Sequence, residues 1–244
     1  IAMLSAAAAV VNCLIEKQID AKMARTAWRP LPSGNLSTNQ TLIFAILLGA
    51  IGFTILITFV NSITAYLTLT TFAGYAFLYT VVLKPLTPQN IVIGGASGAM
   101  PPVLGWAAVN GSVSPEAWLL FLTIFVWTPP HFWALALYRV DDYKRTGLPM
   151  LPVTHGSKFT RLQILLYASL LFPVALSPVL VGMSSYIYLV VSSVATIYFI
   201  ILCWKLYIEY SERTARYVFR YSIYYLSLVF AGLIIDKLVM QLFL

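Results

Sequence analysis

Charged residues are scarce in this sequence: Asp, Glu, Lys and Arg make up 9% of its 244 residues, whereas 60% are hydrophobic. A soluble domain carries about 25% charged residues, so a water-soluble globular protein is excluded. Cysteine is almost absent too. Cys13 and Cys203 cannot form the disulfide framework of a small secreted domain, and we expect both to be free thiols.

Long apolar runs take the place of the missing charges. A helix needs about 20 apolar residues to cross the hydrocarbon core of a bilayer, and lipid offers no water to satisfy the backbone of other structures. Runs of that length lie at 41–60, 62–83, 91–109, 117–138, 162–183, 185–204 and 221–240. The sequence therefore predicts an all-α integral membrane protein with seven full transmembrane helices. The shorter run 1–11 is expected to be the end of a further helix.

The span 91–109 is unusual because it combines several glycines with the pair Pro101–Pro102. Proline removes a backbone donor, so this pair is expected to kink or interrupt the helix. Two interpretations stay open. The broken helix lines a cavity, where irregular backbone is tolerated at membrane depth, or the glycines serve only close helix packing.

Lysine and arginine are missing from every second loop. They fall at 17–29, 84, 139–161 and 205–220, segments that two spans separate from one another, and only Lys237 departs from this pattern. The positive-inside rule makes the basic side cytoplasmic. The net charge of +7 would also suit nucleic acid, but the charges lie in short loops and form no continuous face, so no nucleic-acid partner is expected.

The first basic segment also carries oxygen ligands at helical spacing. Asn12, Glu16 and Asp20 are each four residues apart, which places them on one face of a helix. Two carboxylates and an amide oxygen suit Mg²⁺, which completes its shell with water and substrate phosphate. Arg25 and Arg29 repeat the spacing, and guanidinium groups match phosphate oxygens.

A second acidic and basic cluster follows the fourth span. It comprises Asp141, Asp142, Lys144 and Arg145. Two such clusters on one side of the membrane suggest a diphosphate bridged by metal. The alternative is a pair of ordinary solvated loops that obey the positive-inside rule.

His131 lies inside the span 117–138, about 10 Å from its end at Tyr138 by the rise of a helix. An ionisable residue at that depth is a functional candidate. The alternative is a hydrogen bond to a carbonyl freed by Pro129 and Pro130. The neighbouring Trp127, Phe132 and Trp133 line a flat apolar pocket or only pack; the sequence leaves both open.

The segment from Asn12 to Pro30 resembles the first diphosphate-binding motif of the UbiA-type intramembrane prenyltransferases. More narrowly, several motifs resemble the haem O synthase (protohaem IX farnesyltransferase) branch of that family. They are Met23–Pro30 with Arg25, Thr26 and Arg29; Tyr79, Thr80, Leu83 and Lys84; Asn90 to Gly95; Gly98 to Trp106 with Pro101, Pro102 and Gly105; Trp127 to Trp133; and Asp142, Tyr143 and Pro149 to Pro152. The similarity spans most of the chain.

The resemblance implies a nine-helix bundle, formed as a single transmembrane domain over 1–244 that lacks its first helix and much of the second. It implies transfer of the farnesyl group of farnesyl diphosphate to a vinyl group of haem b, with addition of water, to make haem O. Mg²⁺ is the implied cofactor, and the bacterial inner membrane the implied location. Membrane lipid and other membrane enzymes of the haem pathway are the further expected partners.

The resemblance also implies roles for individual residues. Asn12, Glu16, Asp20, Asp141 and Asp142 are expected to hold metal. Arg25, Arg29, Lys84, Lys144 and Arg145 are expected to hold the diphosphate. Asp20, Glu16, Asp142 and His131 are expected to act in catalysis, and His131, Trp127, Trp133 and Trp106 to form the haem pocket.

This sequence departs from the family pattern in two places. Glu16 stands where aspartate is usual, which keeps the charge on a longer arm. The second cluster has Arg145 and Thr146, and no carboxylates, four residues after Asp141 and Asp142.

Two other functions remain to be considered. The first is transfer of a prenyl group to another acceptor, such as a quinone precursor or a chlorin. The second is secondary transport. A transporter would share the broken helix, but it would carry more ionisable groups at the midplane than this sequence does.

Overall fold

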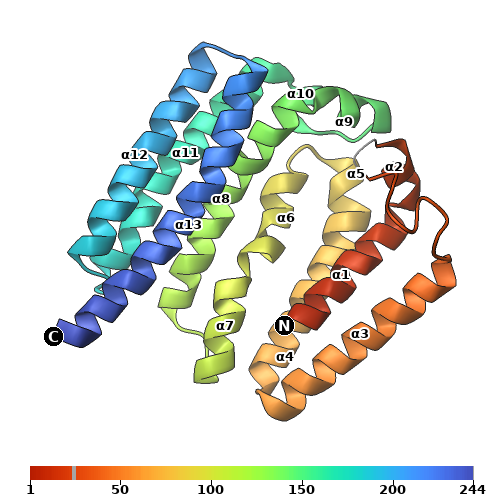
Figure 1. Ribbon diagram of the computed structural model, residues 1–244, viewed down its shortest axis with the longest axis horizontal. Helices are drawn as coiled ribbons and strands as arrows, with labels where there is room; N and C mark the ends of the chain where they lie inside the picture. Colours follow the sequence, from red (N-terminus) through yellow and green to blue (C-terminus); the bar gives the residue numbers. More distant parts are fainter. Residues whose placement is uncertain (24–25, 244) are drawn as a thin grey trace. The chain divides into compact units, whose positions relative to one another are not determined.

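The computed structural model describes residues 1–23 and 26–243, and these residues form helices with no strand among them. Figure 1 shows their arrangement. The helices are α1 (Ala2–Ile15), α2 (Lys17–Lys22), α3 (Thr38–Phe59), α4 (Ser62–Ala73), η1 (Gly74–Leu83), α5 (Lys84–Leu86), α6 (Asn90–Ala99), α7 (Pro101–Asn110), α8 (Pro115–Tyr138), α9 (Val140–Thr146), α10 (Leu151–Thr154), α11 (Gly156–Leu180), α12 (Tyr186–Ile208) and α13 (Glu212–Phe243). The all-α prediction is confirmed.

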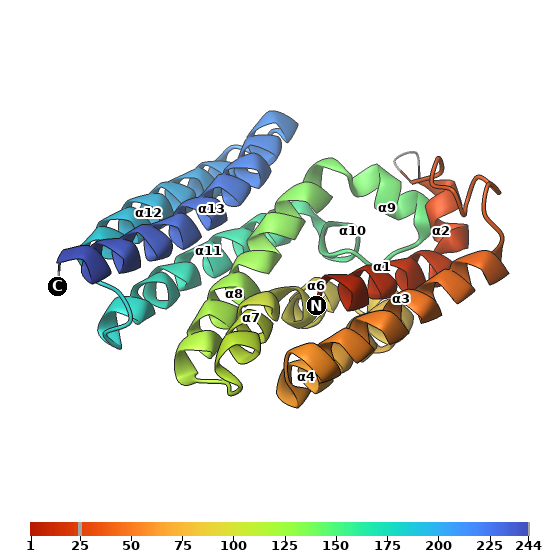
Figure 2. The same cartoon turned by 60° about the horizontal axis from the view of Figure 1, so that its bottom comes forward.

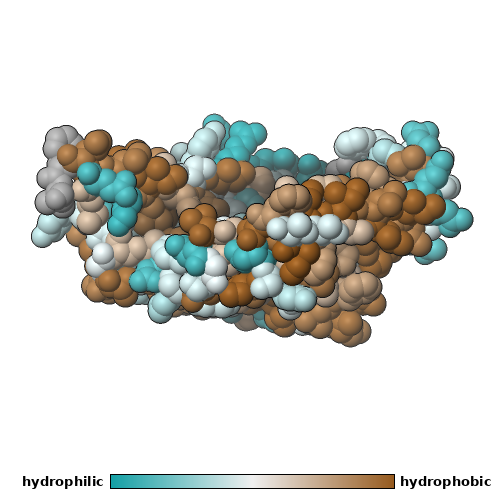
Figure 3. Space-filling view, turned by 90° about the horizontal axis from the view of Figure 1, so that it is seen from below, coloured by the Kyte–Doolittle hydropathy of each residue, from teal (hydrophilic) through white to brown (hydrophobic). Residues whose placement is uncertain are grey.

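Among the described residues, seven helical stretches are long and apolar enough to cross a membrane, as predicted. They are Thr38–Phe59, Ser62–Leu86, Asn90–Asn110, Pro115–Tyr138, Gly156–Leu180, Tyr186–Ile208 and Glu212–Leu242, and the shorter α1 is apolar as well. On α3, large side chains such as Ile43, Phe44 and Leu47 are more than half exposed. Figure 3 likewise shows long apolar stretches on the visible surface. Lipid, rather than water, is the solvent that suits such a surface.

Two helices start more than a turn before the apolar runs predict. α13 begins at Glu212 instead of 221, and α11 begins at Gly156 instead of 162. The added turns contain charged and polar residues that a hydropathy reading rejects. These residues can continue a helix in contact with water, because a helix makes its backbone hydrogen bonds within the segment whatever the polarity of the side chains.

The described residues divide into two compact units. Unit 1 comprises 1–114 and 141–150, and unit 2 comprises 115–140 and 151–244. In unit 1, α1 contacts α3, α4 and η1, while α6 packs on η1 and α7 on α4. Unit 2 is a four-helix bundle in which α8 and α12 each contact both α11 and α13.

The span Ser62–Leu86 changes helix type where it reaches the basic side. α4 passes into the π-helical η1, in which the hydroxyl of Thr80 donates a 2.8 Å hydrogen bond to the carbonyl of Tyr75. Wide turns of this kind often mark functional sites. Gly94 of α6 is required here, since a Cβ atom at that position would lie 2.1 Å from the ring of Tyr79.

The predicted break in the third span is confirmed. α6 ends at Ala99 and α7 begins at Pro101, so Met100 separates the two helices. Pro101 and Pro102 lack the N–H groups that would bond the preceding turn. The first interpretation of this span holds, because Ser97, Gly98 and Pro101 line a hollow. Gly94 also packs closely on Tyr79, so packing is one role of the glycines but not the only role of the span.

Charged side chains cap both ends of α12. At its start, the buried carboxylate of Asp236 accepts hydrogen bonds from the Ser185 N–H and hydroxyl, both 2.6 Å, and from the Tyr188 N–H at 3.2 Å. At its end, Nη1 of Arg161 donates to the carbonyl of Tyr207 at 2.7 Å. An anion at the N-terminus and a cation at the C-terminus both match the helix dipole.

Candidate functional site

Asn12, Glu16 and Asp20 lie on one buried face of α1 and α2. The two helices are separated at Glu16, but the hydrogen-bond repeat continues: Glu16 N–H bonds the Asn12 carbonyl at 2.9 Å, and Asp20 N–H bonds the Glu16 carbonyl at 2.8 Å. The residues are 9%, 6% and 3% exposed. Helical spacing therefore gathers the three side chains inside unit 1, as the sequence predicts.

Both carboxylates are paired with cations from other segments. Lys84 Nζ bonds Glu16 Oε1, and Arg29 Nη1 bonds Asp20 Oδ2 at 2.8 Å. Arg29 also donates to the Sγ atom of Cys13 at 3.5 Å, and Cys13 is a free thiol as predicted. Four of the predicted site residues therefore form two adjacent ion pairs.

Asn12 is oriented by the π-helix. Its Nδ2 donates a hydrogen bond to Thr80 Oγ1 at 3.2 Å, and the Thr80 hydroxyl in turn donates to the carbonyl of Tyr75. The amide nitrogen must therefore face Thr80. Its Oδ1 atom accepts no hydrogen bond from the described residues, so a hard oxygen ligand is available beside the two carboxylates.

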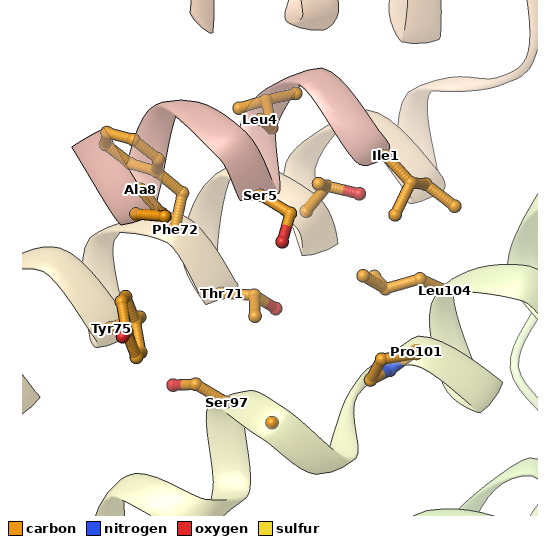
Figure 4. A pocket seen from close by; sticks show the side chains of 13 residues that line it. Ile1, Leu4, Ser5, Ala8, Thr71, Phe72, Tyr75, Ser97, Pro101 and Leu104 are labelled. Atoms are coloured by element: carbon orange, nitrogen blue, oxygen red, sulfur yellow. The ribbon is translucent and has the colours of Figure 1, made fainter. Parts of the chain in front are cut away.

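An apolar hollow of about 240 Å³ begins one turn from Asn12, toward the start of α1 (Figure 4). Leu4, Ser5 and Ala8 of α1 form one wall, and Tyr75 lines it from η1. The opposite wall comes from α6 and α7, including Ser97 and Pro101. Since Ala8 is one helical turn from Asn12, the hollow continues the buried polar face toward the start of α1.

The second acidic cluster is more open to solvent. α9 lies beside α2 in Figures 1 and 2, and its Tyr143 is an electrostatic neighbour of Tyr79. The Asp141 side chain is 79% exposed and contacts Lys144 Nζ at 3.9 Å. Asp142 is half-buried and Arg145 is exposed. Within 1–23 and 26–243, no group of three or more His, Cys, Asp or Glu side chains is assembled for a metal.

Arg25 lies outside the described residues. The two acidic clusters are both in unit 1. The predicted roles of Arg25 and of both acidic clusters in binding metal and diphosphate stay predictions.

His131 lies in unit 2, between two aromatic rings. Trp127 stacks on it at 4.3 Å and Phe219 of α13 at 4.6 Å between ring centroids. Its Nδ1 atom lies 2.7 Å from the hydroxyl of Ser222, and Trp127 Nε1 donates to the Ser222 carbonyl at 2.8 Å. The partner of His131 is thus a side chain on another helix, and not a carbonyl freed by the proline pair.

The tautomer of a neutral His131 follows from these bonds. The Ser222 hydroxyl donates its only proton to the Phe219 carbonyl at 2.6 Å. Nδ1 of His131 must therefore be the donor to Ser222, which leaves the lone pair on Nε2. Nε2 is a common metal ligand and a proton acceptor.

The remaining aromatic residues of the expected haem pocket have different surroundings. Trp133 is 1% exposed and meets the Tyr167 ring edge-on at 5.4 Å within unit 2. Trp106 is half-buried on α7 in unit 1.

Three residues that the structure makes important received no role in the sequence analysis: Thr80, which was named only within a motif, and Ser222 and Asp236, which were missed. Each is a polar residue inside an apolar span, and that signal was available. Their partners lie 68, 91 and up to 51 residues away, so their contacts required the tertiary structure.

Curated relatives match nearly the whole chain. A protein of Acidovorax sp. named protoheme IX farnesyltransferase is 59% identical over 234 residues, which is 96% of this chain and 76% of that protein. A Burkholderia ambifaria protein of the same name is 58% identical, with 96% and 78% covered.

Solved structures share the fold. A digeranylgeranylglyceryl phosphate synthase aligns with a TM-score of 0.80 at 21% identity, covering 96% of this chain and 81% of that one. A UbiA homologue from Archaeoglobus fulgidus bound to DMAPP and Mg²⁺ aligns at 0.65 and 15% identity, with 95% and 84% covered. The model of the UbiA prenyltransferase family matches residues 1–229. The chain is therefore a multi-pass membrane protein of the UbiA prenyltransferase family.

Proposed function

We propose that this protein transfers the farnesyl group of farnesyl diphosphate to a vinyl group of haem b, with addition of water, to make haem O. The observation that carries the proposal is the buried face of Asn12, Glu16 and Asp20, paired with Lys84 and Arg29 beside an apolar hollow. The relatives named protoheme IX farnesyltransferase supply the acceptor.

The donor set suits Mg²⁺. Asn12 Oδ1 and the carboxylates of Glu16 and Asp20 are hard oxygens, and Mg²⁺ needs only a few of them when substrate phosphate and water complete its shell. Asp141 and Asp142 are the proposed second set. The bound metal would neutralise charge on the diphosphate and so assist its departure. A homologue of the same fold has been solved with DMAPP and Mg²⁺.

The cations hold the leaving group. Arg29 and Lys84 are each paired with a carboxylate that Mg²⁺ would engage, so both can turn to the diphosphate when substrate and metal bind. Arg25, Lys144 and Arg145 are the further proposed contacts. As the bond between the farnesyl carbon and the diphosphate oxygen breaks, their fixed positive charge stabilises the charge that develops on that oxygen.

The apolar hollow takes the farnesyl chain. It begins one turn from Asn12, so a diphosphate at Glu16 and Asp20 would direct its chain along α1 toward Leu4 and Ala8. Apolar walls keep water from the allylic cation until the vinyl group of haem attacks it. That attack forms the new carbon–carbon bond and leaves a cation beside the porphyrin ring, which water captures with loss of a proton.

His131 serves the acceptor. Two roles are compatible with a lone pair on Nε2: ligation of the haem iron, or acceptance of the proton that the captured water loses. Trp127, which stacks on His131, is the proposed apolar contact of the haem in unit 2. The haem-pocket roles of Trp133 and Trp106 stay predictions. Ser222 is a positioning residue, because its hydroxyl fixes the tautomer of His131.

The proposal includes a location. The basic loops lie on the cytoplasmic side of the bacterial inner membrane by the positive-inside rule. The single domain over 1–244, the nine-helix family bundle and an association with other haem-pathway enzymes stay predictions.

One experiment tests the function. The purified protein is given haem b, farnesyl diphosphate and Mg²⁺, and products are read by mass spectrometry alongside pyrophosphate release. We expect haem O and Mg²⁺-dependent pyrophosphate. Release without haem O, but with a prenylated quinone precursor or chlorin when these are supplied, would reassign the acceptor. A secondary transporter would release no pyrophosphate.

A further inference from the structure

Unit 2 also contains a hollow, and this one is polar. It lies at the basic ends of α12 and α13. Its volume is about 880 Å³. Lys205 of α12 and Arg213, Arg216 and Arg220 of α13 line it, with Glu212 as the one carboxylate. The lining therefore carries a net charge of +3, and no step of the proposed reaction uses it.

Most of this positive charge is uncompensated. Glu212 Oε2 is bonded to Arg216 Nη2 at 3.2 Å, and the Arg216 guanidinium also lies 4.4 Å from the ring centre of Tyr138. Lys205, Arg213 and Arg220 have no carboxylate within ion-pair distance in the part of the chain that the structure describes. Arg29 and Lys84 in unit 1, by contrast, are both paired.

The length and charge of α13 predict that the hollow lies at the level of lipid headgroups. α13 has 32 residues, a length of about 48 Å, whereas the hydrocarbon core is about 30 Å thick. Its first turns carry Arg213, Arg216 and Arg220, charges that are costly in hydrocarbon, so this end of α13 is expected to extend beyond the core. Exposed Trp204 and Tyr217 lie in the same region, as aromatic residues at membrane interfaces do.

Apolar surface adjoins the hollow on its membrane side. Leu202 and Tyr198 line it there, and on the same two helices the side chains of Ile197, Ile201 and Tyr224 are 47%, 55% and 66% exposed. The hydroxyls of Tyr198 and Tyr217 are 3.1 Å apart. One hydroxyl donates this hydrogen bond to the other, so the accepting hydroxyl can donate its own proton to a bound anion.

We propose that this hollow binds the phosphate headgroup of an anionic phospholipid, whose acyl chains lie along α12 and α13. Lys205, Arg213 and Arg220 contact the phosphate, and a tyrosine hydroxyl donates to it. Basic pockets at the cytoplasmic end of transmembrane helices suit such headgroups. The adjoining apolar surface favours a lipid over a soluble anion.

Native mass spectrometry of the delipidated full chain tests the proposal. Phosphatidylglycerol and phosphatidylcholine are titrated separately. We expect phosphatidylglycerol to bind more tightly, and the double variant Arg213→Gln, Arg220→Gln to weaken it about 30-fold, since each cation near an anionic surface contributes about 1 kcal/mol. The double variant Lys158→Gln, Lys237→Gln removes two exposed cations outside the hollow and should bind as the wild type does.

Three results would overturn the proposal. The first is equal affinity for the two lipids, and the second is an equal loss in the control variant, which would reduce the cluster to a topology signal. The third is displacement of phosphatidylglycerol by haem but not by haem dimethyl ester, which would assign the cations to the carboxylates of the acceptor.

The wild type alone gives an independent check. Binding at an exposed basic hollow must weaken as salt screens the charges. Retention of phosphatidylglycerol that does not change between low and high NaCl would contradict the proposal even if the arginine variants failed to fold.

Discussion

The two units use their buried charges in different ways. In unit 1, the carboxylates of Glu16 and Asp20 meet the side chains of Lys84 and Arg29. In unit 2, the Asp236 carboxylate meets backbone N–H groups at the start of α12, and Arg161 meets backbone carbonyls at its end. Unit 1 thus pairs charged side chains with each other, whereas unit 2 uses charged side chains to satisfy backbone groups at the ends of α12.

The two kinds of contact suit different purposes: the ion pairs of unit 1 suit binding and catalysis, and the helix-end contacts of unit 2 suit stability. An ion pair between side chains can open when a metal and a diphosphate offer each partner a replacement. The backbone groups at the ends of α12 have no such replacement, because no metal or substrate is proposed to bind there and an unpaired buried backbone group is costly. We therefore expect variants of unit 1 charges to lose activity and variants of unit 2 charges to lose stability.

The largest effect is expected for Asp20→Asn. Removing a carboxylate that we propose as a metal ligand should lower turnover about a thousandfold, the size seen when a preorganised electrostatic contact is lost. The fold should survive, since the unpaired Arg29 side chain is 36% exposed and reaches water. Turnover and melting temperature are measured together, with Glu209→Gln, an exposed carboxylate elsewhere in the chain, as the control. Near-normal turnover would remove Asp20 from the site.

Asp236→Asn should do the opposite. The amide retains one acceptor oxygen but loses the charge that three donors share, so unfolding should become easier by roughly 3 kcal/mol. Activity per folded molecule should not change. Chemical denaturation against Lys237→Gln, the exposed neighbour, provides the measurement. If turnover fell while stability held, the contrast between the units would be broken.

His131→Ala tests the exception within unit 2. We expect the haem absorption spectrum to shift, because the Ser222 bond leaves Nε2 free to ligate iron, and turnover to fall about 100-fold. Ser222→Ala should give the same shift to a smaller extent.

Two other results for His131→Ala have different meanings. Normal haem binding without product would assign His131 to water addition. A lower melting temperature with unchanged activity per folded molecule would make the residue structural and would strengthen the comparison.

The smallest effect is expected for Arg29→Lys. Lysine keeps the charge but cannot form two parallel hydrogen bonds to phosphate. The Michaelis constant for farnesyl diphosphate should rise about tenfold, equivalent to about 1.4 kcal/mol, while the constant for haem serves as the internal control. A constant that stayed flat here and in alanine variants of Arg29, Lys84 and Arg145 would leave these residues as topology signals.

Local patterns predicted much of this protein correctly. Spacings of four placed Asn12, Glu16 and Asp20 on one face because helix geometry relates such residues directly. Pro101 and Pro102 broke their helix because the missing donors are a property of the residues themselves. The helix starts at Gly156 and Glu212 were misplaced, since hydropathy reports where a helix leaves the hydrocarbon core and not where it begins.

By itself, the sequence determined the membrane class, the seven spans and the acidic face of α1 and α2, all of which depend on residues close together in the chain. Only the tertiary structure decided which cation meets which carboxylate, that Thr80 turns the Asn12 amide, and that Ser222 sets the tautomer of His131. The physical reason is distance along the chain: Glu16 and Lys84 are 68 residues apart and His131 and Ser222 are 91 apart. No local rule relates such residues, and helix packing alone brings them together.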